Sequence, residues 1–255
     1  MYVARARSYA EIARPGNAML AVMAFCVGYF LVHKVVSWPD FATALGIIFC
    51  VHSAITIQND REDVAIDRIN ASRTPLHAGG MTLEEARYLE WAFTAVAIVL
   101  ALYNPGVHLL PLVVWLAVGW VYNRQPFGFS RRPLLSIVTL GVAYAVIPVA
   151  YGVRLGANQW SALEGIAIAL WFLRRMSVSI LKDYKDEKGD RAMGKRTFYL
   201  VYGHRRTALV SIIMSALAFA GIWVMAAYIR PLNAVVVAPL LLGIVGKVLS
   251  LTALT

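Results

Sequence analysis

Two short segments of the chain carry aspartates at the same spacing. Of the seven aspartates in 255 residues, six lie at residues 59–67 and 183–190. They occupy positions i, i+3 and i+7 in both segments, as Asp60, Asp63 and Asp67 and as Asp183, Asp186 and Asp190. At about 100° per residue, this spacing keeps three side chains within about 60° of one helix face. Each segment is therefore predicted to present a row of three carboxylates that point one way.

Such rows suit a hard divalent cation that is bound together with phosphate. Magnesium prefers oxygen ligands and is usually held by a few carboxylates plus the phosphate oxygens of a substrate. Basic residues that could contact phosphate interleave both rows, namely Arg61, Arg68 and Arg73 in the first and Lys182, Lys185, Lys188 and Arg191 in the second. Two facing rows therefore predict Mg²⁺ ions that bridge a diphosphate and stabilise it as a leaving group.

The elements that must position these rows are membrane helices. Hydrophobic residues make up 60% of the chain and charged residues 15%, whereas soluble domains have about 25% charged residues. A helix needs about 20 mostly apolar residues to cross a bilayer, and an isolated strand in lipid leaves its backbone unpaired. We therefore predict an all-α, polytopic membrane protein with eight spans, at residues 17–36, 41–58, 86–103, 107–123, 134–153, 161–182, 206–229 and 232–253.

Positive charge is distributed unevenly among the loops. The N-terminus and the loops after the second, fourth and sixth spans carry seventeen Lys and Arg residues, whereas the opposite loops carry only Lys34, Arg154 and Arg230. This asymmetry predicts that the N-terminus and both acidic segments face the cytoplasm. It also explains the net charge of +10 as membrane topology, which argues against a nucleic-acid partner.

The order of the spans indicates an internal repeat within a single domain, residues 1–255. Each half, about residues 1–128 and 129–255, has four spans and an acidic segment after its second span. The first aspartates of the two segments, Asp60 and Asp183, are 123 residues apart. Parallel repeats of this kind are related by an axis along the membrane normal. The two carboxylate rows are therefore expected to face each other across one central cavity.

The motifs around the rows resemble the UbiA superfamily of intramembrane prenyltransferases over nearly the whole chain. Asn59-Asp60-x-x-Asp63-x-x-Ile66-Asp67-x-x-Asn70 is similar to the first signature of that family. Lys182-Asp183-x-x-Asp186-x-x-Gly189-Asp190-Arg191-x-x-Gly194-x-x-Thr197 is similar to the second. Arg14-Pro15-x-Asn17 at the first span and Tyr122-Asn123-x-x-Pro126 after the fourth also match recurrent family positions.

The resemblance implies a ring of nine transmembrane helices around a cavity that opens laterally to lipid. It assigns metal binding to Asn59, Asp60, Asp63, Asp67, Asp183, Asp186 and Asp190. It assigns contacts with the diphosphate to Asn17, Asn59, Arg68, Arg73, Lys182, Lys185 and Arg191, and the central catalytic roles to Asp63, Asp186 and Tyr122. Two departures from the family stand out: Thr74 replaces an arginine that often precedes the proline, and Gly128 and Ser130 lie where a lysine is frequent.

The predicted activity is the magnesium-dependent transfer of a prenyl group from an isoprenyl diphosphate to an acceptor within the membrane. The second signature favours an aromatic acid such as hydroxybenzoate, homogentisate or naphthoate, or a chlorophyll-like macrocycle, while a lipid or sugar phosphate stays open. A terpene cyclase on the same scaffold is the alternative. A divalent-ion transporter is disfavoured because both rows lie on one side of the membrane. Arg174 and Arg175, within the sixth span, are candidates for contact with the acceptor or with phosphate.

Overall fold

The computed structural model describes residues 2–32, 37–72, 74–155 and 160–228, and within them every regular element is helical. The elements are α1(Tyr2–Ile12), α2(Pro15–Val32), α3(Trp38–Glu62), α4(Val64–Ile69), α5(Leu83–Ala101), α6(Pro105–Asn123), η1(Phe129–Arg131), α7(Pro133–Gly141), the π-helical turn η2(Val142–Val146), α8(Ile147–Arg154), α9(Ala162–Ser179), η3(Lys182–Tyr184), α10(Glu187–Ala192) and α11(Phe198–Tyr228). The predicted all-α class is therefore confirmed. Seven predicted spans correspond to helices, and the eighth, at 232–253, lies outside the described residues.

The helices identify a multi-pass integral membrane protein. Five stretches of the described chain are long and apolar enough to cross a membrane: Arg7–Val32, Trp38–Glu62, Pro105–Asn123, Pro133–Arg154 and Phe198–Met225. Helices α5 and α9 occupy the other two predicted spans within that part of the chain but carry more charge. In α5 the charged residues fall in the first half of the helix, where Glu90 pairs with Arg61 of α3.

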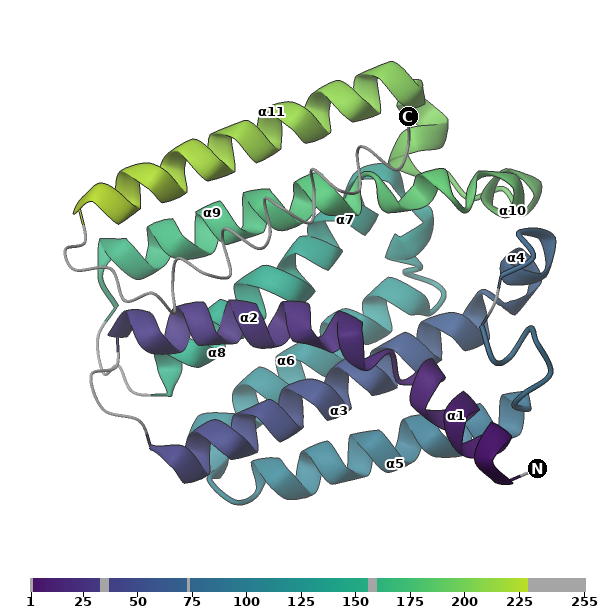
Figure 1. Ribbon diagram of the computed structural model, residues 1–255, viewed down its shortest axis with the longest axis horizontal. Helices are drawn as coiled ribbons and strands as arrows, with labels where there is room; N and C mark the ends of the chain where they lie inside the picture. Colours follow the sequence, from purple (N-terminus) through teal and green to yellow (C-terminus); the bar gives the residue numbers. More distant parts are fainter. Residues whose placement is uncertain (1, 33–36, 73, 156–159, 229–255) are drawn as a thin grey trace.

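The long helices lie side by side, and the two acidic segments meet at one end of them. Figure 1 shows α9 and α11 as neighbours, α3 and α5 as another pair, and α4 beside α10 at the same end of the molecule. Because α4 follows α3 and α10 follows α9 and η3, each acidic segment continues directly from a long helix. This arrangement brings residues that are 123 positions apart in the sequence to one site.

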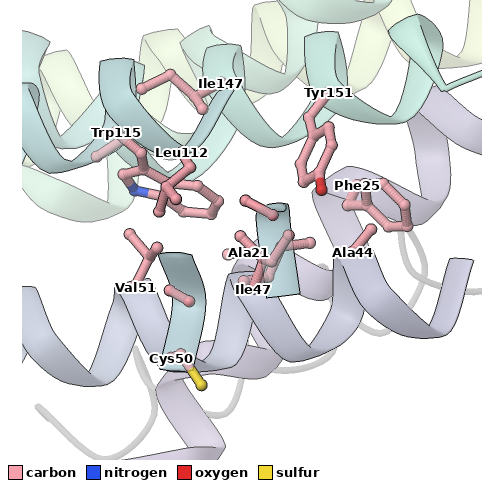
Figure 2. Packing of buried hydrophobic residues seen from close by; sticks show 14 of the residues in the cluster. Ala21, Phe25, Ala44, Ile47, Cys50, Val51, Leu112, Trp115, Ile147 and Tyr151 are labelled. Carbon is pink, nitrogen blue, oxygen red and sulfur yellow. The ribbon is translucent and has the colours of Figure 1, made fainter. Parts of the chain in front are cut away.

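The main hydrophobic core lies away from the acidic end. It is built by α2, α3, α5, α6, η2 and α8, and Phe25, Ile47, Trp115 and Tyr151 are all at most 2% exposed. Figure 2 shows Phe25 of α2 and Tyr151 of α8 packed near Ala44 of α3. Their rings lie 5.4 Å apart between centroids, which is typical of favourable aromatic packing. This core fixes how the first half of the chain packs against the second.

Two glycines allow α2 and α8 to come into backbone contact. A Cβ atom added at Gly28 would lie 2.0 Å from the carbonyl oxygen of Val149, and one at Gly152 would lie 2.2 Å from that of Phe25. Small residues are favoured at helix interfaces in membranes because they permit such close approach.

We predict that Gly28→Ala destabilises the protein by about 1–3 kcal/mol or more, because the backbones of α2 and α8 must separate to admit the methyl group. Thermal unfolding in detergent measures the effect as a loss of several degrees. The matched control is Gly165→Ala in α9, where an added Cβ would have no neighbour within 4 Å. Equal unfolding temperatures for the two variants would contradict the proposed role of this contact.

Candidate active site

In both acidic segments a short helix begins directly after the middle carboxylate. Helix α3 ends at Glu62, and Asp63 separates it from α4; in the second segment, Asp186 precedes α10. The two junctions share one backbone conformation, with φ −99° and ψ 8° at Asp63 and φ −102° and ψ 6° at Asp186. The prediction that each row occupies one continuous helix face is therefore wrong. The break turns the third aspartate of each row onto a short helix of its own.

The two short helices also end in the same way. The amide of Ser72 donates to the carbonyl of Asp67, and the amide of Lys195 donates to that of Asp190, both at 2.9 Å. The preceding residues, Ala71 and Gly194, have φ values of 49° and 67°. A left-handed residue followed by this backbone bond forms a Schellman cap. The shared geometry therefore extends over ten consecutive positions, 63–72 and 186–195, at an offset of 123 residues.

Direct contacts hold α4 against α10. The side-chain amide of Asn70 donates to the carbonyl of Asp186 at 3.2 Å, and its oxygen accepts the amide hydrogen of Gly189 at 2.7 Å. A Cβ atom at Gly189 would lie 2.6 Å from the carbonyl oxygen of Ile66. The second row can therefore approach the first only because residue 189 has no side chain.

All six clustered aspartates border one small cavity of about 70 Å³, together with Asn59, Ser130 and Thr197. It adjoins a larger cavity of about 270 Å³ that lies between α2, α3, α6, α7, η2 and α9. The residues that border both are Arg14, Asn59, Lys182, Lys185 and Asp186. The acidic cavity therefore forms the mouth of a pocket that runs into the membrane region.

Three cations neutralise part of this charge. Both carboxylate oxygens of Asp60 accept hydrogen bonds from Arg14, at 2.7 and 2.9 Å. The Lys195 ammonium lies between the two rows, 3.0 Å from Asp63 and 3.5 Å from Asp190, and its side chain is 8% exposed. Lys182 lies 3.7 Å from Asp183. The rows thus face each other as predicted, with a lysine between them.

The acidic cavity still carries uncompensated negative charge. Oδ2 of Asp183 and Oδ1 of Asp190 are buried without a hydrogen-bond partner. Burial raises the pKa of Asp183, and it raises the pKa of Asp190 to about 6 although Lys195 opposes the shift. Burial, reinforced by repulsion from Asp63, also raises the pKa of Asp67.

Within the described residues, no three carboxylate, histidine or cysteine side chains are close enough together to hold a metal ion. The donor set nevertheless fits a hard cation, because carboxylates from both rows border the same cavity and two of their oxygens have no hydrogen-bond partner. Lys195 occupies the space between the rows where such a cation would compensate the charge.

The side chains expected to contact the diphosphate fall into two groups. Asn17, Asn59, Tyr122, Lys182 and Lys185 border the larger cavity, and the Lys182 ammonium donates to the Tyr122 hydroxyl at 2.8 Å. Asn59 also donates to Asp63 at 3.2 Å.

The other group lies outside this site. Arg68 and Arg191 are exposed and border neither cavity, and Arg191 pairs with Glu187 at 3.0 Å. Their predicted contacts with the diphosphate are not supported by these positions. Arg73 lies outside the described residues.

Several residues at the site were not in the predicted set. Arg14 belongs to the Arg14-Pro15-x-Asn17 motif, and this motif could have identified it as a site residue. Thr197 belongs to the second signature, which could likewise have identified it. Lys195 had no comparable signal, because it reaches the cavity only through the turn after α10. Of the two arginines in the sixth span, Arg175 borders the larger cavity, whereas Arg174 lies over the Phe219 ring of α11.

A membrane-embedded helical fold with paired aspartate rows at the mouth of a deep pocket defines an intramembrane enzyme of the prenyl-transfer class. The sequence model of the UbiA prenyltransferase family matches residues 21–254. The chain belongs to this family, and it is a prenyltransferase.

Curated relatives carry a more specific name. Digeranylgeranylglyceryl phosphate synthase from Natronomonas pharaonis is 30% identical over 248 residues, which cover 96% of this chain and 81% of the relative. The synthase of the same name from Methanoculleus marisnigri is 29% identical over 207 residues, which cover 79% of this chain and 71% of the relative.

Solved structures share the fold. A UbiA homologue from Archaeoglobus fulgidus bound to DMAPP and Mg²⁺ superposes with a TM-score of 0.73 at 19% identity, over 93% of this chain and 86% of that one. A structure described as giving insight into digeranylgeranylglyceryl phosphate synthase in membranes has a TM-score of 0.62 at 19% identity, over 85% and 76% of the two chains.

We predict that Gly189→Ala lowers kcat at least about tenfold in a protein that still folds. The added methyl group must push α10 away from α4 and so misalign the two rows, and displacements of about 1 Å can cost about a hundredfold in rate. Steady-state turnover measures the effect. Lys188→Ala, an exposed neighbour on the same helix, is the control, and a loss of the same size there would contradict this explanation.

Proposed function

We propose that this prenyltransferase takes its prenyl group from an isoprenyl diphosphate in a magnesium-dependent reaction at the two aspartate rows. The observation that carries the proposal is the shared cavity: six carboxylates border a space that leads into a pocket between helices. A diphosphate at the mouth would leave the prenyl chain in the pocket, next to apolar side chains such as Leu20, Val118 and Leu140.

The ligands proposed for Mg²⁺ are Asn59, Asp60, Asp63 and Asp67 from the first row and Asp183, Asp186 and Asp190 from the second. When bound, the metal would neutralise the diphosphate and stabilise it as a leaving group. The long side chain of Lys195 can turn from its place between Asp63 and Asp190 toward a phosphate oxygen. The Lys195 ammonium, which now compensates the carboxylates, would then stabilise the negative charge of the departing diphosphate.

The chain's own residues supply the remaining parts of the mechanism. Lys182, held by the Tyr122 hydroxyl, and Lys185 lie at the boundary of the two cavities and are placed to donate to diphosphate oxygens. An allylic diphosphate ionises by breaking its C–O bond, and preorganised charge favours that step. The helices around the pocket keep water from the allylic cation. The nucleophile of the acceptor then bonds to the cation and loses its proton.

The proposed acceptor is a glyceryl phosphate that already carries one prenyl chain. The support is the name shared by the relatives, since their product is a glyceryl phosphate with two such groups. This proposal departs from the aromatic acceptor favoured by the second sequence signature. A terpene cyclase is the second candidate, and a product that contains the acceptor would exclude it.

We predict that Asp63→Asn and Asp186→Asn each lower the rate about a hundredfold or more, because each removes one charge from the proposed metal site. The assay incubates purified protein with prenyl diphosphates of C10 to C20, Mg²⁺ and an acceptor panel, read by mass spectrometry. Wild-type protein assayed in chelator defines the background rate, and added Mg²⁺ should restore its activity.

Glu187→Gln is the control for these two variants, because Glu187 pairs with Arg191 and Tyr199 and does not border the acidic cavity. Its rate should stay within about threefold of wild type. Near-native turnover of both aspartate variants in folded protein would refute the two-row mechanism.

The asymmetry of Lys and Arg between the loops supports a cytosolic position for both aspartate segments. We predict that single cysteines at the exposed Glu84 and Lys188 react with an impermeant thiol reagent only from the cytoplasmic side. Lys195 is unsuitable as a reporter because its side chain is buried. Cys26 and Cys50 must first be replaced. Labelling of intact cells from outside at both positions would reverse the proposed orientation.

A further inference from the structure

A polar group lies at the inner part of the larger cavity, away from the aspartate rows. His52 of α3, Tyr144 of η2 and Arg175 of α9 all border this cavity. The guanidinium of Arg175 lies 4.2 Å from the centroid of the Tyr144 ring, and the His52 ring lies 5.5 Å from the same ring. Three helical elements therefore bring their polar side chains together within the membrane region.

The charge of Arg175 has no carboxylate to balance it. Among residues 2–32, 37–72, 74–155 and 160–228, no Asp or Glu forms an ion pair with Arg175, and its Nε is buried without a hydrogen-bond partner. The face of Tyr144 attracts the cation, but it cannot accept the hydrogen bonds that a guanidinium donates. A cation at such a depth is costly and in most proteins marks a binding site.

His52 is the second observation that points to a ligand. It is 3% exposed, and both of its ring nitrogens lack a hydrogen-bond partner in the described structure. A buried imidazole without any partner is expensive. Because His52 borders the same cavity as Arg175, a ligand that enters the cavity can accept a hydrogen bond from both side chains.

The two residues lie at equivalent positions in the two halves of the chain. Arg175 follows His52 by 123 residues, the same offset that relates the two aspartate rows. His52 lies seven residues before Asn59, and Arg175 lies seven residues before Lys182. Seven residues of helix span about 10 Å. His52 is therefore about two turns of α3 deeper than Asn59, and Arg175 contacts the Tyr144 ring at that deeper level.

We propose that His52 and Arg175 form a binding site for an anionic group of the prenyl acceptor, a phosphate or a carboxylate. The inference rests on the proposed function and narrows it to acceptors that carry negative charge. A guanidinium pairs well with either anion, because its planar donors match two oxygens at once.

The donor diphosphate is not the natural partner of this site. It has Lys182, Lys185 and the aspartate rows at the mouth, whereas Arg175 borders the larger cavity only. An acceptor fixed by its anion at the inner site can extend its nucleophile back toward the mouth. The first carbon of the prenyl chain would lie there, next to the departing diphosphate.

The test compares Arg175→Gln and Arg174→Gln, which remove the same charge from adjacent positions. Arg174 lies over Phe219 and does not border the cavity. The probes are 4-hydroxybenzoate and a glyceryl phosphate with one geranylgeranyl chain, each paired with its uncharged alcohol. Binding of each probe is measured by calorimetry with Mg²⁺ and inorganic diphosphate present, and binding of geranylgeranyl diphosphate is measured separately without acceptor.

We expect Arg175→Gln to weaken binding of at least one anionic probe by about a hundredfold, as removal of one partner of a buried charged pair does. Arg175→Lys should recover part of the loss, and His52→Phe should weaken the same probe by about tenfold. Affinity for geranylgeranyl diphosphate should change less than threefold in every variant. Weaker binding of 4-hydroxybenzoate would identify the anion as a carboxylate. Weaker binding of the glyceryl phosphate would identify it as a phosphate.

Three results would overturn the inference. They are equal binding of charged and uncharged probes by wild-type protein, an unchanged affinity of Arg175→Gln for anionic probes, and a parallel loss of geranylgeranyl diphosphate binding. Wild-type protein that binds no geranylgeranyl diphosphate in the presence of Mg²⁺ would instead refute the proposed function, so the two failures are distinguishable.

Discussion

The structure depends on holding six like-charged carboxylates around one small space. Like charges at close range repel each other, and the low dielectric of a buried site strengthens the repulsion. The fold opposes it with Arg14 and Lys195, which bind Asp60, Asp63 and Asp190, and with the contacts of Asn70 that hold α4 to α10. The negative charge that these contacts leave uncompensated is the charge that we propose Mg²⁺ neutralises.

The two acidic segments share a backbone conformation over ten residues, but positions 123 residues apart differ in the side chains that matter chemically. Asn59 and Lys182, Ser72 and Lys195, and His52 and Arg175 are pairs related by 123 residues, and in each pair the second member is cationic. Ile66 and Gly189 are related in the same way, and the missing side chain at residue 189 makes room for the first half. The repeat therefore builds a symmetric frame, within which most of the positive charge comes from one side. The division into two half-repeats stays a prediction, and we propose it as the origin of this correspondence.

Much of the fold and part of the site could be predicted from the sequence. Hydropathy located the described membrane helices because burial in lipid dominates their energetics, and the i, i+3, i+7 spacing located both rows. The break at Asp63 and Asp186 was not predictable from periodicity, since it depends on the packing of α4 against α10. The diphosphate contacts predicted for Arg68 and Arg191 lack support for one geometric reason. Each arginine directly follows the third aspartate of its row, and one residue along a helix turns the side chain by about 100°, away from the cavity that the aspartate borders. Lys195 was missed because only the tertiary fold returns it to the cavity.

The backbone contact between Gly28 and Gly152 has a consequence for how the protein is made. Its two glycines are separated by more than 120 residues, which a ribosome adds in roughly 6 to 25 seconds at about 5–20 residues per second. During that interval α2 has entered the bilayer without the helix against which it packs, and Phe25 lacks Tyr151. Helix α2 therefore lies in lipid without its partner α8, while α3, α5 and α6 of the same half can already pack. The core closes, and the two aspartate rows acquire their fixed separation, only after the second half has been inserted.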